Sequence, residues 1–331
     1  MVMISIICPI HNEGEYIKGC IESILSQDYP KDKMEIFFVD GMSTDNTREI
    51  VNTYSENSPF IHLLDNPSII VPCAMNIGIK AAKGDIIIRL DGHALYPSNY
   101  FSELVRWHEL LPDAWNIGGL CDTRVVNSNP ESEAIAKVMS DKIGVGNSTF
   151  RTGSNRKYIE ADTVPFGAYK SFVFEKVGLY HEQLARVQDI ELNKRIKHAG
   201  GKIYLVPSIH CTYIPRDNFM AFSRNRYLTG YWVIKTCFIT KTTKNLGLRH
   251  FIPALFVLSL VLPLILGFIW WPFYLITVAV ALLYVGGMLC RSIMINDEKT
   301  SVWSLFNAFC CLHFSYGWGS IKACLDRVFK N

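Results

Sequence analysis

Short apolar runs alternate with segments of helical spacing along the first quarter of the chain. The runs cover residues 3–8, 35–39, 61–64 and 86–90, and they have the length and continuous hydrophobicity of buried strands. Between them, isoleucine and leucine recur at the intervals of an amphipathic helix. This alternation predicts an α/β domain with a Rossmann-like, mostly parallel sheet and helices on both faces.

The middle of the chain is less regular but keeps elements of the same kind. Residues 117–121 and 203–206 have the composition of further strands, and a helix is expected to open at Asp189. Residues 144–155 are rich in glycine, serine, threonine and asparagine, which predicts a mobile loop. We therefore expect the first domain to cover residues 1–217.

The pattern changes after residue 217. Aromatic and basic residues alternate in clusters through 218–250, a composition that suits interfacial amphipathic helices. An ordinary surface helix packed on the first domain is the alternative. A membrane module is expected to follow over 251–331, and its proximity favours the interfacial interpretation.

Two apolar segments open this module. Residues 251–271 and 273–290 are each long enough to cross a hydrocarbon core about 30 Å thick, and together they predict a transmembrane helical hairpin. The less apolar segment 302–319 is expected to be re-entrant or interfacial. The turn of the hairpin has no basic residues. Basic residues flank the hairpin on both sides: Lys241, Lys244, Arg249, Arg291 and Lys299. The positive-inside rule then places the first 250 residues in the cytoplasm of a multi-pass protein of a bacterial-type inner membrane.

Charge and cysteine content narrow the class of protein. The net charge of +3 over 331 residues is too small to indicate a nucleic-acid partner. The ten cysteines form no C-x-x-C pair, which is typical of a reducing compartment. Both observations agree with a first domain that lies in the cytoplasm beside membrane lipids.

The residues with the most specific chemistry follow the run 86–90. Asp91 and His93 flank a glycine at the carboxyl end of this strand, where open α/β sheets bind ligands. A carboxylate and an imidazole can hold Mg²⁺ or Mn²⁺ together with substrate phosphates. An ordinary Asp-Gly turn is the alternative interpretation.

Further motifs fall on the same predicted sheet edge. They are Cys-Pro-Ile-His-Asn-Glu at 8–13, Phe-Val-Asp-Gly-Met-Ser-Thr-Asp at 38–45 and Ala-Met-Asn-Ile-Gly at 74–78. With these motifs in this order, the chain over residues 3–235 resembles the family 2 glycosyltransferases of GT-A fold. It is most similar to the membrane-bound succinoglycan-synthesis type, in which the D-x-D motif reads D-x-H.

The resemblance implies a binding site for a UDP-sugar. Glu13 and Asp40 would meet the ribose and uracil, and Pro9 would shape the base pocket. Asn76 and Arg89 would lie near the diphosphate and the sugar. The two side chains of the D-x-H motif would hold Mn²⁺ or Mg²⁺ on that diphosphate, so that Asp91 also belongs to the donor site.

The resemblance also implies residues on the acceptor side. The family's acidic pair reads Gln188-Asp189 here, so Asp189 would be the catalytic base, and a helix N-cap is its structural alternative. Glu191 is the second candidate base. Arg226 and Trp232 match an interfacial stretch of the family and would contact acceptor or diphosphate, with membrane anchoring as the alternative.

These residues together predict an inverting, metal-dependent hexosyltransferase. It would move a sugar from a UDP-sugar to a lipid-linked, polyprenyl-diphosphate saccharide in polysaccharide biosynthesis. Transfer to polyprenyl phosphate itself is one alternative. A non-catalytic sugar-nucleotide-binding membrane protein is the other.

Overall fold

The computed structural model describes residues 1–146, 148–242 and 247–329, and these form two compact units. The first unit joins Met1–Asp122 to Thr149–Ile214, and the second joins Thr123–Ser148 to Pro215–Asn331. The expected boundary at 217 therefore lies close to the observed one at 214, but residues 123–148 leave the first domain and group with the C-terminal helices.

The first unit is built on a nine-stranded sheet with the strand order β3-β2-β1-β4-β8-β6-β9-β5, and β7 pairs with β9. Its strands are β1 (Ile4–Ile10), β2 (Met34–Asp40), β3 (Ile61–Asp65), β4 (Ile86–Arg89), β5 (Ala94–Leu95), β6 (Ala114–Thr123), β7 (Ile159–Glu160), β8 (Ala168–Lys170) and β9 (Lys202–Tyr213). The sheet is mixed, because β1 to β4 are parallel whereas β8 pairs antiparallel with both β4 and β6. The expectation of a mostly parallel sheet thus holds only for the half in which helices alternate with strands.

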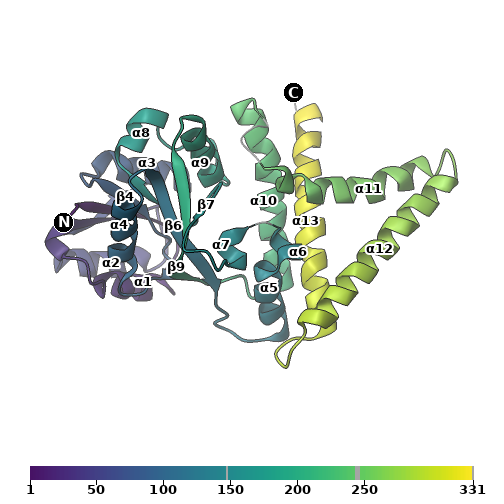
Figure 1. Ribbon diagram of the computed structural model, residues 1–331, viewed down its shortest axis with the longest axis horizontal. Helices are drawn as coiled ribbons and strands as arrows, with labels where there is room; N and C mark the ends of the chain where they lie inside the picture. Colours follow the sequence, from purple (N-terminus) through teal and green to yellow (C-terminus); the bar gives the residue numbers. More distant parts are fainter. Residues whose placement is uncertain (147, 243–246, 330–331) are drawn as a thin grey trace. The chain divides into compact units, whose positions relative to one another are not determined.

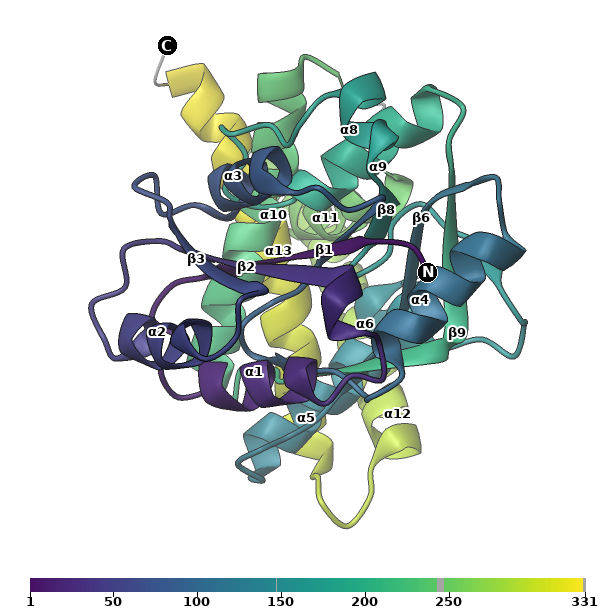
Figure 2. The ribbon, with the colours of Figure 1, turned by 90° about the vertical axis from the view of Figure 1, so that its left-hand side faces the viewer.

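Helices cover both faces of this sheet, as Figure 2 shows for α3 and α9 above it and α1 and α2 below it. Alternate residues of β1 explain the two layers, since Ile6 and Cys8 join one apolar core and Ile7 joins the other. The helices of this unit are α1 (Ile17–Leu25), α2 (Thr47–Glu56), α3 (Val71–Ala81), α4 (Tyr100–Leu110), α7 (Thr149–Thr152), α8 (Phe172–Val177) and α9 (Gln188–His198). Helix α7 lies inside the segment 144–155, which is therefore not loop throughout.

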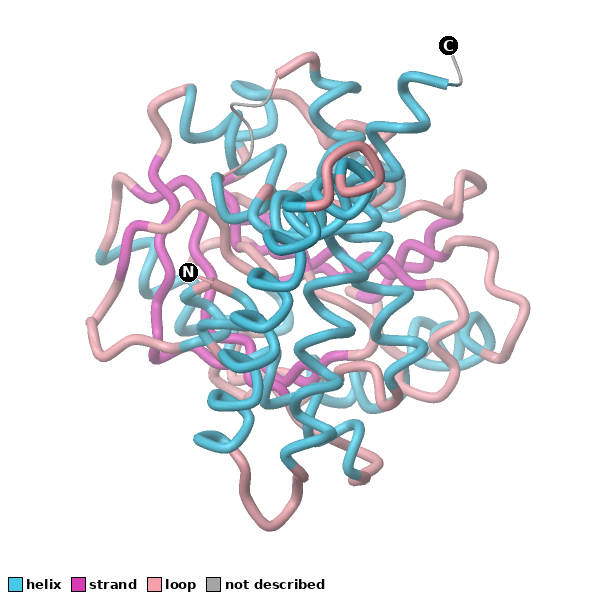
Figure 3. The backbone as a smooth tube through the Cα atoms, turned by 90° about the vertical axis from the view of Figure 1, so that its right-hand side faces the viewer, coloured by secondary structure: helices cyan, strands magenta, loops and turns pink. Residues whose placement is uncertain are grey.

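The second unit is built from helices (Figures 1 and 3). They are α5 (Pro130–Ser140), α6 (Lys142–Val145), α10 (Phe219–Thr240), α11 (Ile252–Leu266), α12 (Pro272–Ile295) and α13 (Val302–Phe329). Ion pairs explain why α5 and α6 belong here: Lys137 lies 2.6 Å from Asp297, and the buried Asp141 pairs with Arg291 of α12. A buried carboxylate needs a cationic partner, so these ion pairs hold residues 123–148 against the C-terminal helices.

Helix α10 packs along α13, and glycines permit the close approach (Figure 1). A Cβ atom on Gly230 would lie 2.0 Å from the Tyr316 carbonyl oxygen, and one on Gly319 would lie 2.0 Å from the Tyr227 carbonyl oxygen. The segment expected as interfacial amphipathic helices thus contains the 22-residue helix α10, which packs along α13, and a short 3-10 helix, η2 (Leu248–His250). Residues 243–246 of that segment lie outside the described part.

The apolar segments differ in length from the expected spans. Helix α12 has 24 residues, is long and apolar enough to cross a membrane, and its most apolar window is unburied. Helix α11 has only 15 residues, because the chain leaves the helix at Gly267. A Cβ atom there would meet the Tyr274 ring at 2.5 Å, so the turn packs tightly before α12 begins. Residues 302–319, expected to be re-entrant or interfacial, belong to the continuous helix α13.

Candidate active site

The carboxyl ends of the parallel strands bring the predicted motifs to one edge of the first unit. Ile10 at the end of β1 is aligned with Asp40 at the end of β2, and Arg89 ends β4 beside Ile7. Asp91 and His93 follow within four residues of Arg89. The structure therefore confirms that these three motifs share a sheet edge.

Asp91 and His93 are held on opposite sides of Gly92. The Asp91 backbone N–H donates to the Tyr96 hydroxyl at 2.9 Å, which fixes the turn. A Cβ atom on Gly92 would come within 3.0 Å of an Ile10 methyl group and 3.3 Å of the Glu13 Cγ, so a larger residue would crowd the site.

Glu13 orients the imidazole of His93. Its Oε1 lies 3.0 Å from His93 Nδ1, and we assign Nδ1 as the donor because the carboxylate can only accept. A carboxylate–imidazole pair of this kind fixes the tautomer and leaves Nε2 as the nitrogen that can coordinate a metal. The structure thus gives Glu13 a contact other than the expected one with the nucleoside.

The donor atoms at this edge fit a divalent cation with few protein ligands. Among the described residues, no three His, Cys, Asp or Glu side chains converge as a ligand set. Asp91 and His93 supply one hard oxygen ligand and one nitrogen ligand, and Mg²⁺ is commonly held by one or two carboxylates together with substrate phosphates. The pair therefore fits a cation shared with a substrate diphosphate.

Arg89 connects Asp91 to Asp189, which is 100 residues away in the sequence. Its Nη2 lies 3.0 Å from Asp91 Oδ1, and its Nη1 donates to Asp189 Oδ2. Burial by itself would lower the pKa of the Arg89 guanidinium, but Asp189 and Asp91 outweigh that effect and raise the pKa well above its usual value. Both terminal nitrogens of Arg89, which was expected near the donor diphosphate, thus contact carboxylates, whereas its buried Nε has no hydrogen-bond partner among the described residues.

Asp189 lies in the first turn of α9 but does not cap it. The N-cap residue is Val187, with a φ of 67°, and no side chain caps the helix. The structural alternative for Asp189 is therefore wrong, and its observed partner is Arg89. The second carboxylate oxygen, Oδ1, is buried and has no hydrogen-bond partner among the described residues.

Glu191 is unsuited to be the base. It is buried, and Arg195 binds both of its oxygens at 2.8 Å. Arg195 also donates to the backbone carbonyls of Val177 and Leu179, so the pair joins α9 to the end of α8. Asp189 remains the only one of these two acids that lies with the Asp91 motif.

Asp40 and Pro9 occupy the adjoining part of the edge. The Asp40 side chain is fully buried and accepts from Arg48 Nη1 at 2.7 Å and from the Ser43 backbone at 3.0 Å. Pro9 is half-buried and aligned with Val39 of β2. The predicted contact of Asp40 with uracil therefore requires its present partners to rearrange.

The polar atoms of the Asn76 side chain form hydrogen bonds with the backbone and are therefore not available at the sheet edge. Its Oδ1 accepts from the Tyr180 N–H at 2.9 Å, and its Nδ2 donates to the Tyr180 carbonyl at 2.9 Å. The same Nδ2 reaches Glu182 at 3.0 Å. This arrangement favours a role in fixing the Tyr180 segment over direct contact with a diphosphate.

The remaining predicted residues belong to the other unit. Arg226 and Trp232 lie on α10, where the Arg226 guanidinium lies 5.6 Å from the Phe222 ring and Lys235 Nζ lies 4.4 Å from the Trp232 ring. Their predicted contacts with acceptor or diphosphate remain predictions.

Sequence analysis missed two tyrosines that shape the edge. Tyr96 holds the Asp91 backbone, and the Tyr213 ring meets the His93 ring edge-on at 6.3 Å. Tyr96 lies five residues after Asp91, so its proximity was a usable signal. Tyr213 comes from β9, and only the pairing of β9 with β5 brings it near.

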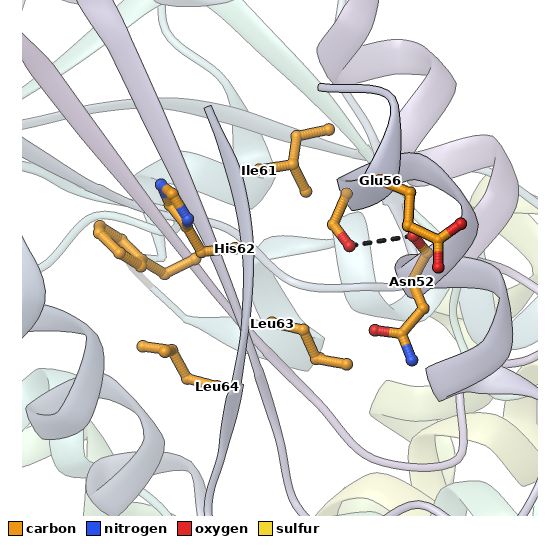
Figure 4. Close-up of a pocket in the computed structure, with 8 residues that line it drawn as sticks. Asn52, Glu56, Ile61, His62, Leu63 and Leu64 are labelled. Atoms are coloured by element: carbon orange, nitrogen blue, oxygen red, sulfur yellow. Dashed lines mark hydrogen bonds between the residues drawn. The ribbon is translucent and has the colours of Figure 1, made fainter. Parts of the chain in front are cut away.

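A surface hollow lies away from these residues, between α2 and β3 (Figure 4). Its lining residues are Phe37, Asn52, Ser55, Glu56, Ile61, His62, Leu63 and Leu64. None of the predicted site residues lines it, so the sheet edge remains the candidate site.

Comparison with solved structures identifies the fold. The mannosyltransferase PcManGT from Pyrobaculum calidifontis matches with a TM-score of 0.59 at 18% identity, over 100% of this chain and 88% of that one. Residues 1–349 of S. aureus TarS match with a TM-score of 0.55 at 16% identity, over 98% and 91% of the two chains. These likenesses show that the fold is of GT-A type.

Sequence relatives give the family. The family model "Glycosyl transferase family 2" matches residues 5–166. A Methanococcus voltae enzyme, dolichyl N-acetyl-alpha-D-glucosaminyl phosphate 3-beta-D-2,3-diacetamido-2,3-dideoxy-beta-D-glucuronosyltransferase, is 30% identical over 70% of this chain and 72% of its own length. The succinoglycan biosynthesis protein ExoA of Rhizobium meliloti (strain 1021) is 28% identical over 75% and 73%. The chain belongs to glycosyl transferase family 2.

Proposed function

We propose that this protein is an inverting glycosyltransferase that moves a sugar from a UDP-sugar to a lipid-linked, polyprenyl-diphosphate saccharide at the cytoplasmic membrane face. The observation that carries the proposal is the convergence of Asp91, His93 and Asp189 at one sheet edge, where Arg89 bridges Asp91 and Asp189 and Glu13 contacts His93. A cation-binding pair and a separate carboxylate are the groups that this transfer requires.

The donor side rests on Asp91 and His93. These residues would hold Mn²⁺ or Mg²⁺, and Glu13 keeps the imidazole in the coordinating orientation. Such a cation, when bound, stabilises the negative charge that develops on a departing diphosphate. The proposal is supported by related folds solved with donors, since PcManGT was solved with GDP-Man and Mn²⁺ and TarS with UDP-GlcNAc.

The acceptor side rests on Asp189. Its carboxylate would take the proton from the acceptor hydroxyl as that oxygen bonds to the anomeric carbon and the bond from this carbon to the diphosphate oxygen breaks. One displacement inverts the anomeric centre. Arg89 Nη1 donates to Asp189 Oδ2 and so holds this carboxylate beside the Asp91 motif.

The membrane module supports a lipid-linked acceptor. Helix α12 exposes an apolar surface long enough to span a bilayer, and the turn before it exposes Trp270 and Trp271. Dolichyl phosphate occurs in the name of the Methanococcus relative, and the Rhizobium relative belongs to succinoglycan biosynthesis. A membrane-bound enzyme would meet a polyprenyl-linked saccharide in the plane of the leaflet.

The function is tested by a donor and acceptor screen with the purified full chain. We expect nucleotide release from one UDP-sugar, dependent on both a divalent cation and a polyprenyl-diphosphate saccharide extract. Release with polyprenyl phosphate alone would support the alternative acceptor. Release only from GDP-sugars would contradict the donor assignment, and binding without turnover over all donors and acceptors would support a non-catalytic binder.

The topology is tested with reporters. A reporter fused to the C-terminus should be cytoplasmic, and one inserted between Trp270 and Trp271 should be external, because the flanks of the hairpin are basic and its turn is not. A reporter inserted after the exposed Asn155 of the first unit is the matched cytoplasmic control. An external C-terminus would mean that α13 also crosses, and a cytoplasmic turn would contradict the spanning hairpin.

A further inference from the structure

Two arginines at the predicted site, Arg89 and Arg48, form ion pairs with carboxylates. Arg89 is bound to Asp91 and Asp189. Arg48, the cation beside the predicted nucleoside residue Asp40, is divided between that carboxylate and Asp65. A donor diphosphate carries negative charges that a single divalent cation shared with Asp91 does not fully balance, so a further cation is needed.

Arg151 of α7 lies on the His93 side of the site. Its guanidinium carbon is 5.2 Å from the centre of the Tyr213 ring and 5.4 Å from that of Phe150. The Tyr213 ring in turn meets His93 edge-on, and Tyr213 pairs with Ala94, the residue after His93. One aromatic ring therefore separates Arg151 from a predicted metal ligand.

The Arg151 guanidinium has no acidic partner among the described residues. Its Nη1 is buried and finds no hydrogen-bond acceptor in that part of the chain. Leaving a charged donor buried and unsatisfied is costly, so such a group calls for a partner that the folded chain does not itself supply. Stacking on Tyr213 and Phe150 holds the side chain in place but leaves Nη1 without an acceptor among the described residues.

The electrostatics of a nearby thiol place Arg151 and Asp91 in one neighbourhood. A hydrogen bond with Cys211 lowers the pKa of Cys121, and Arg151 acts in the same direction while Asp91 opposes it. Both charges are therefore close enough to act on one buried group between β6 and β9.

We propose that Arg151 binds the distal phosphate of the donor's diphosphate. The nucleoside is expected at the ends of β1 and β2, whereas Tyr213 and His93 lie by β9 and β5, so a cation there meets the phosphate farther from the nucleoside. A guanidinium suits this role because its fork of N–H donors matches phosphate oxygens. This inference rests on the proposed use of a nucleotide-sugar donor.

The test compares Arg151→Met and Arg151→Lys with Arg156→Met. Methionine keeps an unbranched stem against Tyr213 and Phe150 but removes the charge. Arg156 is an exposed arginine five residues away, so its variant is a matched control for lost charge. Affinities for UDP, UMP and uridine are measured calorimetrically with the purified full chain and Mn²⁺.

We expect Arg151→Met to weaken UDP binding by about 10- to 100-fold, the range expected for a lost charge-assisted hydrogen bond, while uridine and UMP affinities change little. Arg151→Lys should recover part of the loss, and Arg156→Met should bind UDP as the unaltered protein does.

Equal UDP affinity in Arg151→Met and Arg156→Met would overturn the inference. An equal loss for uridine, UMP and UDP would overturn it as well, because it would show a general effect on the fold. Failure of the proposed function looks different: the unaltered protein itself would bind no UDP with Mn²⁺.

Discussion

Asp189→Asn should lower turnover by about 10²–10⁴-fold, the usual contribution of general-base assistance, while UDP-sugar affinity changes little. Asparagine keeps the size of the side chain and can still accept from Arg89 through its amide oxygen. It cannot take the acceptor proton. Steady-state rates at saturating donor and acceptor, with donor affinity measured separately by calorimetry, check the result.

The structure makes Asp189→Asn a more specific test, because it removes one of the two roles that the sequence allowed for Asp189. An N-cap role would have been kept by asparagine, but Val187 is the N-cap, so the variant tests the carboxylate itself. Asp162→Asn is the matched control. Asp162 is a half-exposed acid that pairs with Lys197 of α9, the helix that carries Asp189. That control should leave turnover close to the unaltered value.

A near-normal rate in folded Asp189→Asn would contradict the base assignment. Glu191 could not then replace it, since Arg195 binds both of its oxygens. The remaining explanation would be an acceptor that is already anionic, such as polyprenyl phosphate. The ion pair between Asp189 and Arg89 is compatible with that alternative, so the same variant also distinguishes the two acceptors.

Hydrophobic pattern predicted the first half of the sheet closely. The run at 35–39 became β2, Met34–Asp40, and the run at 61–64 became β3, Ile61–Asp65. These strands are short, apolar and separated by helices, so local sequence alone determines their extent and parallel pairing. The edge motif at Asp91 and His93 followed from the same regularity.

The pattern could not predict contacts that depend on distant pairing. Strand β8 runs antiparallel to β4 although they lie some eighty residues apart, and no local period encodes that direction. The bond from Arg89 to Asp189 spans 100 residues. Sequence analysis therefore expected Arg89 near the donor and could not predict its contacts with two carboxylates.

Hydrophobicity also located the apolar helices better than it located their ends. Composition is nearly uniform from 251 to 290, so it cannot show that α11 ends at Leu266 while α12 continues to Ile295. The ion pair between Asp141 and Arg291 depends on a segment 150 residues earlier in the chain. That distance explains why 123–148 was expected in the catalytic domain.

Asp91→Ala should abolish most transfer, by at least about 10²-fold, since a metal ion contributes several kcal/mol to stabilising transition-state charge. Among the described residues, no group of three His, Cys, Asp or Glu side chains offers an alternative ligand set. Excess chelator should have the same effect on the unaltered protein, and Mn²⁺ or Mg²⁺ should restore it.

A graded series separates loss of the cation from loss of structure. Glu13→Gln leaves both ligands in place but weakens the orientation of His93, so it should lower metal affinity about 10- to 100-fold and recover activity at high Mn²⁺. Asp91→Ala should not recover at any Mn²⁺ concentration, because a ligand itself is gone. Asp122→Ala, which removes an exposed acid paired with His210, is the control and should need no extra metal. Full activity of the unaltered protein in excess chelator would contradict the roles of Asp91 and His93, whereas equal Mn²⁺ dependence in all variants would show that Asp91 acts through Arg89 alone.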